Sequence, residues 1–350
     1  MRRLTDSGVR RARLRAQLLS GPVPRSVDDV VGRLVGVQAQ DATAAALAVR
    51  ARSRGLVAGD VDRAREERRV VLTWSLRGTR HLHRAQDARW LVALVGPTFL
   101  RPSKRAEQLG IAGAVGDRAV EVLVDALAAE GPLTRPQVKD LLAPHGVDPS
   151  GQAAIHVIAR AGLEGRLCVL PGERYVLLDE WIGEAAAGGR PGHLARRYLA
   201  AFGPASPADF GAWSGLGPPA ARREWAAIAA DLVEVAPSLW LLAAGVDRAV
   251  AAARRPGPTR LVGAFDSLLL AYADRHLHLS PDHARLVNPG DGMVKPLVVV
   301  DGRVAGTWSR PGGGVDARPF PTSSTPAVDR EADDVRRFLD VSDICPGYTP

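Results

Sequence analysis

The sequence predicts an α+β protein with three tandem winged helix-turn-helix modules followed by a small C-terminal antiparallel β-domain, barrel-like in form. Two observations indicate this fold class. A pattern of three helices and a hairpin recurs along the chain, and its Gly-Pro turns at Gly131 and Gly203 are about 70 residues apart, a domain-sized repeat. Beyond residue 243 short apolar runs alternate with turns, which is typical of β-structure.

The recurring pattern is found at three places. Three helices followed by a hairpin is the order of a winged helix-turn-helix. In the first module, Ser26 and Asp41 are suitable N-caps for the second and third helices. We expect the following elements: helices over 4–19, 26–35 and 41–49 with a hairpin over 70–83; helices over 120–129, 136–142 and 151–163 with a hairpin over 165–178; helices over 193–202, 207–213 and 218–230 with a hairpin over 232–242.

The C-terminal part carries strand and turn patterns. Asp301-Gly302 is a strong two-residue hairpin turn between two of its apolar runs. We expect strands over 261–270, 294–300 and 303–308, loops at 312–314 and 319–326, and a final helix over 329–339. The resulting domain boundaries are 1–85 for the first winged helix, 86–116 for a helical linker, 117–180 and 190–242 for the second and third winged helices, and 243–350 for the β-domain with its final helix.

The charge of the chain indicates a polyanionic partner. The 350 residues carry a net charge of +8 and a sequence pI of about 10.2. Of the 46 basic residues only Lys104, Lys139 and Lys295 are lysines. Guanidinium groups bind phosphate with two parallel hydrogen bonds, so the composition favours double-stranded DNA as partner. A genomic bias toward arginine in place of lysine would explain the ratio of arginine to lysine, but it would not explain the excess of basic over acidic residues.

Several classes of protein are excluded by the composition. The apolar runs are of strand length, far too short to span a bilayer, and the first residues lack the apolar core of a signal peptide, so we expect a cytoplasmic, nucleoid-associated protein without membrane contact. The two cysteines, Cys168 and Cys345, are too few for a zinc site or a disulfide framework.

The most informative short stretch is Val37-Gln38-Ala39-Gln40, which follows Gly36. In an extended backbone residues i and i+2 project to the same side, whereas in a helix they stand roughly 200° apart. If the preceding helix ends near Gly36, both amides can face one ligand or one water. The alternative is that the two glutamines are ordinary polar residues at a helix–helix corner, bonded to nearby backbone.

Histidine and carboxylate side chains are alternative candidates for catalytic or metal-binding residues. His81 and His83, like His276 and His278, alternate so that each pair shares a strand face, but no third ligand lies at a useful spacing. We therefore expect no metal and no cofactor. Asp41 directly follows the glutamine pair and is better placed to cap the next helix.

The order of these motifs resembles one family over nearly the whole chain. Three winged-helix modules, a C-terminal β-domain and Gln38-Ala39-Gln40 after the second helix are similar to the AlkZ/YcaQ group of bacterial winged-helix DNA glycosylases, whose catalytic motif is Gln, an apolar residue, then Gln or Asp. Further matching stretches are 73–81, 265–269 and 300–308. Ala39 is smaller than the aliphatic residue usual in the motif.

The resemblance implies a monofunctional DNA glycosylase. Such an enzyme hydrolyses the N-glycosidic bond of N7-alkylguanine, including interstrand crosslinks, in DNA repair or in self-resistance to a DNA-alkylating antibiotic. The catalytic residues would be Gln38 and Gln40, which would hold the attacking water. The residues that bind DNA or the lesion would be Arg77, Arg80, His81 and Asp266, of which Asp266 is equally well explained as a turn residue.

The alternative function is a winged-helix DNA-binding protein without catalysis, such as a transcriptional regulator, because a fold does not fix a function. Regulators usually bind as dimers to paired half-sites. The sequence has no long amphipathic dimer helix, and we expect a monomer.

Overall fold

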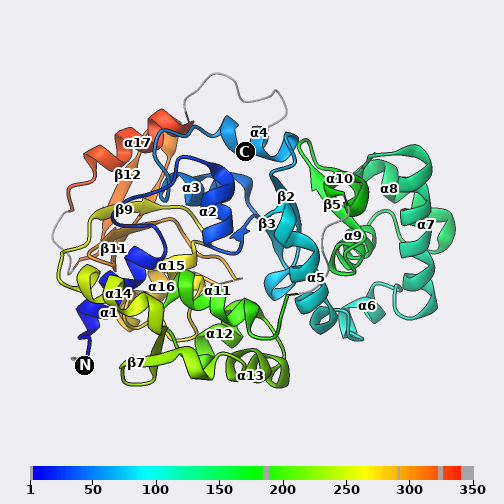
Figure 1. Cartoon of the computed structure of the whole chain (residues 1–350). Helices are drawn as coiled ribbons and strands as arrows, with labels where there is room; N and C mark the ends of the chain where they lie inside the picture. The colour runs from blue at the N-terminus through cyan, green and yellow to red at the C-terminus, as the bar shows by residue number, and fades with distance from the viewer. Residues whose placement is uncertain (1–2, 184–188, 291, 322–325, 340–350) are drawn as a thin grey trace. The chain divides into compact units, whose positions relative to one another are not determined.

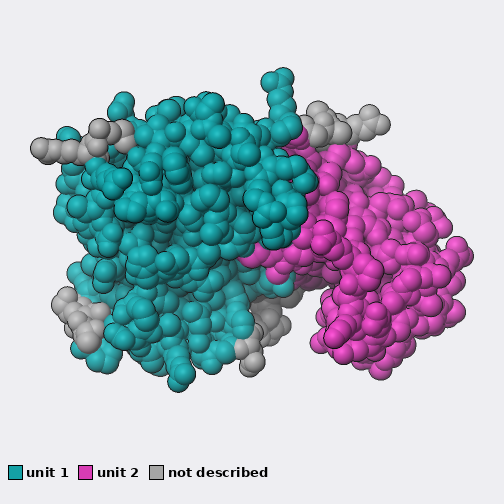
Figure 2. Space-filling view, turned by 90° about the horizontal axis from the view of Figure 1, so that it is seen from below, with its two compact units in different colours: residues 1–61, 190–350 teal, residues 62–189 magenta. Residues whose placement is uncertain are grey.

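The computed structural model describes residues 3–183, 189–290, 292–321 and 326–339. The chain divides into two units (Figure 2). The larger unit is formed by residues 1–61 and 190–350, and the smaller unit by residues 62–189. The first module expected from the sequence, 1–85, contributes residues to both units, and the finer division of the chain stays a prediction.

The larger unit begins with the three expected helices and a very short strand. They are α1 (Asp6–Ala16), α2 (Val27–Arg33), β1 (Val37–Gln38) and α3 (Ala42–Arg50), and α4 (Gly59–Glu66) follows at the boundary of the two units. The expected N-cap at Ser26 is confirmed, because its Oγ accepts a hydrogen bond from the Asp29 backbone N–H at 3.2 Å. Helices α1 and α2 are shorter than expected, and α3 covers residues 42–50 in place of the expected 41–49.

The smaller unit contains two hairpins and a set of helices (Figure 1). Its elements are β2 (Val70–Trp74), η1 (Leu76–Gly78), β3 (Arg80–Arg84), α5 (Ala85–Phe99), α6 (Lys104–Gln108), α7 (Ala114–Glu130), β4 (Leu133–Thr134), α8 (Arg135–Leu142), η2 (Ala143–His145), α9 (Ala153–Leu163), β5 (Leu167–Leu170), β6 (Arg174–Leu177) and α10 (Leu178–Ile182). Both expected hairpins are confirmed, and helices α5 and α6 lie in the stretch 86–116, whose role as a linker stays a prediction.

The two hairpins of the smaller unit join in one sheet. Its strands follow the order β3-β2-β5-β6-β4, and Leu72 pairs with Val169 where the hairpins meet. Helix α9 lies tightly on β2, since a Cβ atom at Gly162 would stand only 2.5 Å from Cε3 of Trp74. Because Gly162 has no side chain, α9 can pack directly on the sheet and support the β2–β3 hairpin.

The larger unit resumes with a second copy of this order. Its elements are α11 (His193–Phe202), α12 (Pro207–Ser214), α13 (Pro218–Ala226), η3 (Ala229–Asp231), β7 (Leu232–Ala236), β8 (Leu239–Leu242), η4 (Ala243–Gly245) and α14 (Val246–Ala253). In the smaller unit Leu133 pairs with Tyr175, and here Ala205 forms the corresponding bridge with Trp240. The repeated order is the one the sequence predicts, although the number of winged-helix modules stays a prediction.

The last part of the larger unit is a sheet with short helices around it. Its elements are β9 (Thr259–Val262), α15 (Ser267–Leu270), η5 (Pro281–His283), α16 (Ala284–Val287), β10 (Leu297–Val300), β11 (Arg303–Ser309), η6 (Pro311–Gly313), β12 (Asp316–Pro319) and α17 (Asp329–Leu339). The strands are antiparallel in the order β12-β11-β10-β9, and α17 lies against β9 (Figure 1). Among the described residues this sheet is open, so the expected barrel is not found.

Local signals in this part are confirmed where they are strongest. Asp301 and Gly302 have positive φ angles of 47° and 77°, as a type I′ turn requires, and Val300 pairs with Arg303 across it. The final helix occupies the predicted residues. Of the loop expected over 319–326, residues 322–325 lie outside the described residues.

One expected strand is wrong. The run 261–270 was predicted as a single strand, but β9 ends at Val262 and helix α15 begins at Ser267. The chain turns at Phe265, whose φ is 55°, and Asp266 then caps the helix with its side chain. An apolar run alone cannot distinguish a strand from a strand followed by a buried helix.

Candidate active site

The Gln38–Gln40 segment is not helical, as the sequence predicts. Helix α2 ends at Arg33, and β1 covers Val37 and Gln38. Val37 and Ala39 are each 4% exposed, whereas Gln38 is partly buried and Gln40 is exposed. This alternation buries Val37 and Ala39 and leaves the two glutamines outside the core, as side chains that alternate along a strand do.

The chain enters this segment through a constrained turn. Val35 is fully buried with a φ of 65°, a conformation that is uncommon for a β-branched residue. Its N–H donates to the Gly32 carbonyl, which also accepts a hydrogen bond from Nη2 of Arg197 at 2.7 Å. Packing and hydrogen bonding thus compel the backbone to leave the helix before the first glutamine.

The chain leaves the segment through a capped helix. Oδ1 of Asp41 accepts a hydrogen bond from the Ala44 backbone N–H at 2.7 Å, and Asp41 has the extended dihedral angles of an N-cap. The expected capping role is therefore confirmed. Since Gln40 immediately precedes the cap, the start of α3 fixes where its amide stands.

The β2–β3 hairpin carries the arginines expected to face DNA. Its strands pair from Val70–Arg84 to Trp74–Arg80, and its tip contains η1 with Arg77 at a φ of 55°. Nη1 of Arg80 lies 2.8 Å from a carboxylate oxygen of Glu173, at the tip of the neighbouring hairpin. The charge of Arg80 is therefore shared with an acid that sequence reasoning did not find.

His81 and His83 lie on one face of β3, as predicted. Their rings are stacked with centroids 5.8 Å apart. Nδ1 of His81 lies 3.0 Å from the Thr79 carbonyl oxygen, and Nε2 of His83 lies 2.7 Å from the Ser75 hydroxyl. Burial, and then the charge of Arg77, hold the pKa of His81 well below its usual value, so its imidazole is neutral.

Asp266 occupies a different environment from the one expected of a DNA-binding residue. It is 1% exposed, and its two oxygens accept hydrogen bonds from Nη1 and Nη2 of Arg52 at 2.8 and 2.7 Å. It also caps α15 through the Leu268 N–H at 2.8 Å. These contacts assign Asp266 a structural role. Because its side chain is buried, a contact between Asp266 and DNA stays a prediction.

The predicted site residues thus form three local groups. Gln38 and Gln40 share one segment, Arg77, Arg80 and His81 share one hairpin, and Asp266 is held in the core of the larger unit. Sequence reasoning missed their partners Arg52 and Glu173. No local signal could have found these partners, since they lie 214 and 93 residues away from the residues they bind.

His276 and His278 do not share a face, contrary to the expectation. Residues 273–279 form turns rather than a strand, and His276 is exposed whereas His278 is 1% exposed. Among the described residues, no group of three or more His, Cys, Asp or Glu side chains could hold a metal ion. Burial raises the pKa of the Cys168 thiol to about 12, so this buried side chain is a poor nucleophile.

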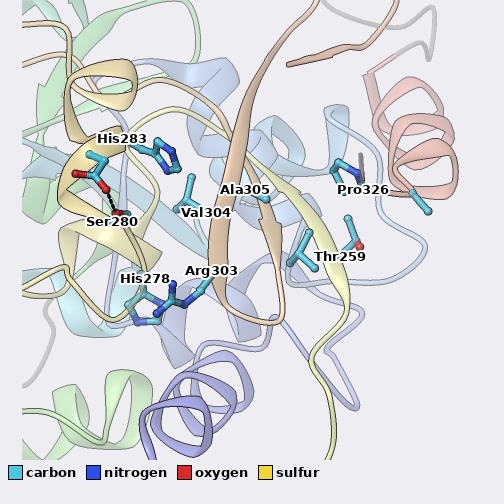
Figure 3. A pocket seen from close by; sticks show the side chains of 11 residues that line it. Thr259, His278, Ser280, His283, Arg303, Val304, Ala305 and Pro326 are labelled. Carbon is cyan, nitrogen blue, oxygen red and sulfur yellow. Dashed lines mark hydrogen bonds between the residues drawn. The ribbon is translucent and has the colours of Figure 1, made fainter. Parts of the chain in front are cut away.

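A pocket of about 520 Å³ lies within the larger unit, and none of the predicted site residues lines it. Its walls include Thr259, His278, His283 and Arg303 (Figure 3). Both ring nitrogens of His278 are engaged: Nδ1 lies 2.7 Å from the Gly302 carbonyl oxygen, and Nε2 lies 3.3 Å from Nη1 of Arg13. His278 is therefore a structural part of the pocket wall.

No helix among the described residues is long and apolar enough to cross a membrane.

Comparisons with known proteins agree with one another. The family model of AlkZ-like DNA glycosylases matches residues 31–338. The interstrand DNA cross-link repair glycosylase of Streptomyces sahachiroi is 29% identical over 361 residues, which cover 94% of this chain and 95% of the relative. The solved structure of Streptomyces sahachiroi DNA glycosylase AlkZ aligns with a TM-score of 0.86 and 27% identity over 98% of both chains.

These matches define the protein first as an enzyme, a DNA glycosylase that acts on DNA. The chain belongs to the AlkZ-like DNA glycosylase family. The alternative of a non-catalytic regulator is therefore set aside.

Proposed function

We propose that this enzyme hydrolyses the N-glycosidic bond of N7-alkylguanine, both in single adducts and in interstrand crosslinks. The Streptomyces sahachiroi relative is an interstrand DNA cross-link repair glycosylase, which supports this choice of substrate. An N7-alkylguanine is cationic and already a good leaving group. The enzyme therefore needs no acid to protonate the base, and must mainly place a water molecule and stabilise positive charge on the sugar.

Gln38 and Gln40 position the water in this proposal. The observation that supports it is the alternating burial of residues 37–40, in which Val37 and Ala39 are buried, Gln38 is partly buried and Gln40 is exposed. A glutamine carbonyl cannot act as a base of useful pKa, but it can accept a hydrogen bond from water and orient the attacking lone pair. Two such acceptors fix the water better than one.

The proposed partner is double-stranded DNA bound by a monomer in the nucleoid. Arg77 and Arg80 approach its phosphates from the β2–β3 hairpin, and the net charge of +8 supports binding. The biological role would be DNA repair, including self-resistance to a DNA-alkylating antibiotic.

The test is single-turnover release of base from two duplexes, one with N7-methylguanine and one with a bis-N7-guanine crosslink. Wild type is compared with the double variant Gln38→Ala, Gln40→Ala. A matched control is Gln86→Ala, Gln108→Ala, which removes two exposed glutamines from helices α5 and α6. Duplex binding is measured in parallel by fluorescence anisotropy.

We expect the site variant to bind duplex as wild type does but to release base at least about 100-fold more slowly, since misplacement of a reacting group commonly costs this much. The control should match wild type. Unchanged release by the site variant would disprove the role of the glutamines. Failure of wild type to release either base would disprove the proposed substrate.

A further inference from the structure

The starting point is the proton on His81. Nδ1 of His81 lies 3.0 Å from the Thr79 carbonyl oxygen, which can only accept a hydrogen bond. Nδ1 must therefore carry hydrogen. A neutral imidazole has a single N–H, so Nε2 of His81 presents a lone pair and can only accept.

The surroundings keep the ring in this state. His81 is 2% exposed, so burial disfavours the charged form. The guanidinium of Arg77 and the ring of His83 disfavour it further, and the pKa of His81 stays well below its usual value. A second proton, which would turn Nε2 into a donor, is therefore not taken up near neutral pH.

The lone pair is held in place and keeps a small contact with solvent. The stacked ring of His83 supports His81, and the Ser75 hydroxyl, 2.7 Å from Nε2 of His83, fixes that ring in turn. Among the described residues Nε2 of His81 has no hydrogen-bond partner, yet it is not one of the polar atoms sealed from solvent. The acceptor is thus preorganised toward a ligand.

DNA offers few groups that can donate to such an acceptor. Phosphate and deoxyribose oxygens within a strand have no hydrogen to give, and a phosphate would be repelled by the lone pair. Only the N–H groups of the bases remain. N7-alkylguanine presents N1–H and N2–H on one edge, and its positive charge makes both of them stronger donors.

We propose that Nε2 of His81 accepts a hydrogen bond from N1–H or N2–H of N7-alkylated guanine and makes His81 a specificity-determining residue. This inference rests on the proposed function for its substrate. Adenine lacks both N1–H and N2–H, and its N6–H donor lies at another position of the edge, so the same contact disfavours adenine lesions.

The charge of the base changes during the reaction, and this change predicts which kinetic quantity His81 controls. When the N-glycosidic bond breaks, its electron pair moves to the base, and the cationic ring becomes neutral. The N–H groups are therefore strongest as donors before the transition state. A contact that is stronger in the ground state improves binding and does not accelerate the chemical step.

The experiment compares wild type, His81→Phe and His81→Gln on three duplexes. Phenylalanine keeps an aromatic ring but removes the lone pair, and glutamine restores an acceptor. The duplexes contain 7-methylguanine, 7-methylhypoxanthine, which lacks N2–H, or 1,7-dimethylguanine, which lacks N1–H. Single-turnover assays give the half-saturating enzyme concentration and the maximal rate for each pair.

For 7-methylguanine we expect His81→Phe to raise the half-saturating concentration about 10- to 100-fold without lowering the maximal rate, because one hydrogen bond to a charged group is lost from the ground state. For the analogue that lacks the contacted N–H, His81→Phe and wild type should behave alike. His81→Gln should recover part of the loss. Comparison within each duplex cancels the effect of the analogue on base pairing.

An equal loss on all three duplexes, or a loss confined to the maximal rate, would overturn the inference, because it would indicate a structural role or a contact with water. No effect of His81→Phe would also overturn it. If His81→Phe does not fold, the wild-type data alone still test the inference. Equal half-saturating concentrations of wild type for all three duplexes would contradict it. Release of 7-methylguanine by wild type, without this discrimination, leaves the proposed function standing and rejects only the role of His81.

Discussion

Arg52 and Asp266 form a fully buried ion pair in which both guanidinium Nη atoms donate to the carboxylate, at 2.8 and 2.7 Å, and both side chains are 0% exposed. Arg52 stands just beyond the end of α3, and Asp266 caps α15. The pair therefore ties the helix that follows the glutamine segment to the start of the C-terminal part.

Breaking this pair from one side should be costly. Asp266→Ala leaves a buried guanidinium without its counter-charge, and we expect the free energy of unfolding to fall by about 3–5 kcal/mol. Urea denaturation measures the change. The exposed pair Arg318–Asp316 is the control, and Asp316→Ala should cost at most about 1 kcal/mol. If Asp266 instead contacts DNA, its variant would lose duplex affinity at unchanged stability.

Removing the cap of α3 should affect both stability and catalysis. Asp41→Ala frees the Ala44 N–H, and we expect a loss of about 1 kcal/mol in unfolding free energy together with slower base release, because Gln40 stands next to the frayed turn. Asp41→Ser should keep most of both. Ser103→Ala removes a similar cap from α6 and should leave release unchanged. Normal release by Asp41→Ala would show that the cap does not position the glutamine.

Glu173 should weaken the binding of the β2–β3 hairpin to DNA. Its carboxylate lies 2.8 Å from Arg80, so Glu173→Gln releases positive charge at the proposed DNA-facing hairpin. We expect several-fold tighter duplex binding and a salt dependence steeper by up to about 0.9 in log–log slope. Glu121→Gln makes the same charge change beside Arg166 and is the control. Equal effects of the two substitutions would mean that only net charge matters.

Acid should destabilise the larger unit through His278. Burial first, and then Arg13, lower the pKa of His278 to about 3. Between about pH 3 and the unfolded pKa of about 6.5, the unfolded chain binds a proton at His278 and the folded chain does not. The contribution of His278 to the free energy of unfolding is therefore complete above about pH 6.5. It falls as the pH falls, by up to about 1.4 kcal/mol per pH unit.

Urea denaturation at pH 7, 6 and 5 tests this pH dependence. His278→Gln cannot titrate but can still bond to Gly302 and Arg13, and it should be less stable at pH 7 yet lose less stability on acidification. The control is His145→Gln at an exposed position, which should follow wild type. A slope that is the same in all three proteins would exclude His278 as its source.

Much of the secondary structure follows from local patterns. The Asp301-Gly302 turn, the Ser26 and Asp41 caps, the recurring helices and the final helix depend on dihedral preferences and short-range hydrogen bonds, and these are written in neighbouring residues. The non-helical Gln38–Gln40 segment belongs with them, because Gly36 and Asp41 bound it. The run 261–270 failed because the same apolar residues suit a buried strand and a buried helix.

The sequence by itself determined the order of elements, the basic character of the protein, the family and the segment that carries the paired amides. Only the tertiary structure decided the state of the individual side chains: Asp266 became a buried partner of Arg52, Arg80 a partner of Glu173, and His81 a neutral acceptor. The physical reason is that charge, tautomer and exposure depend on atoms brought close by folding. Those atoms belong to residues far away in the chain, which no local pattern specifies.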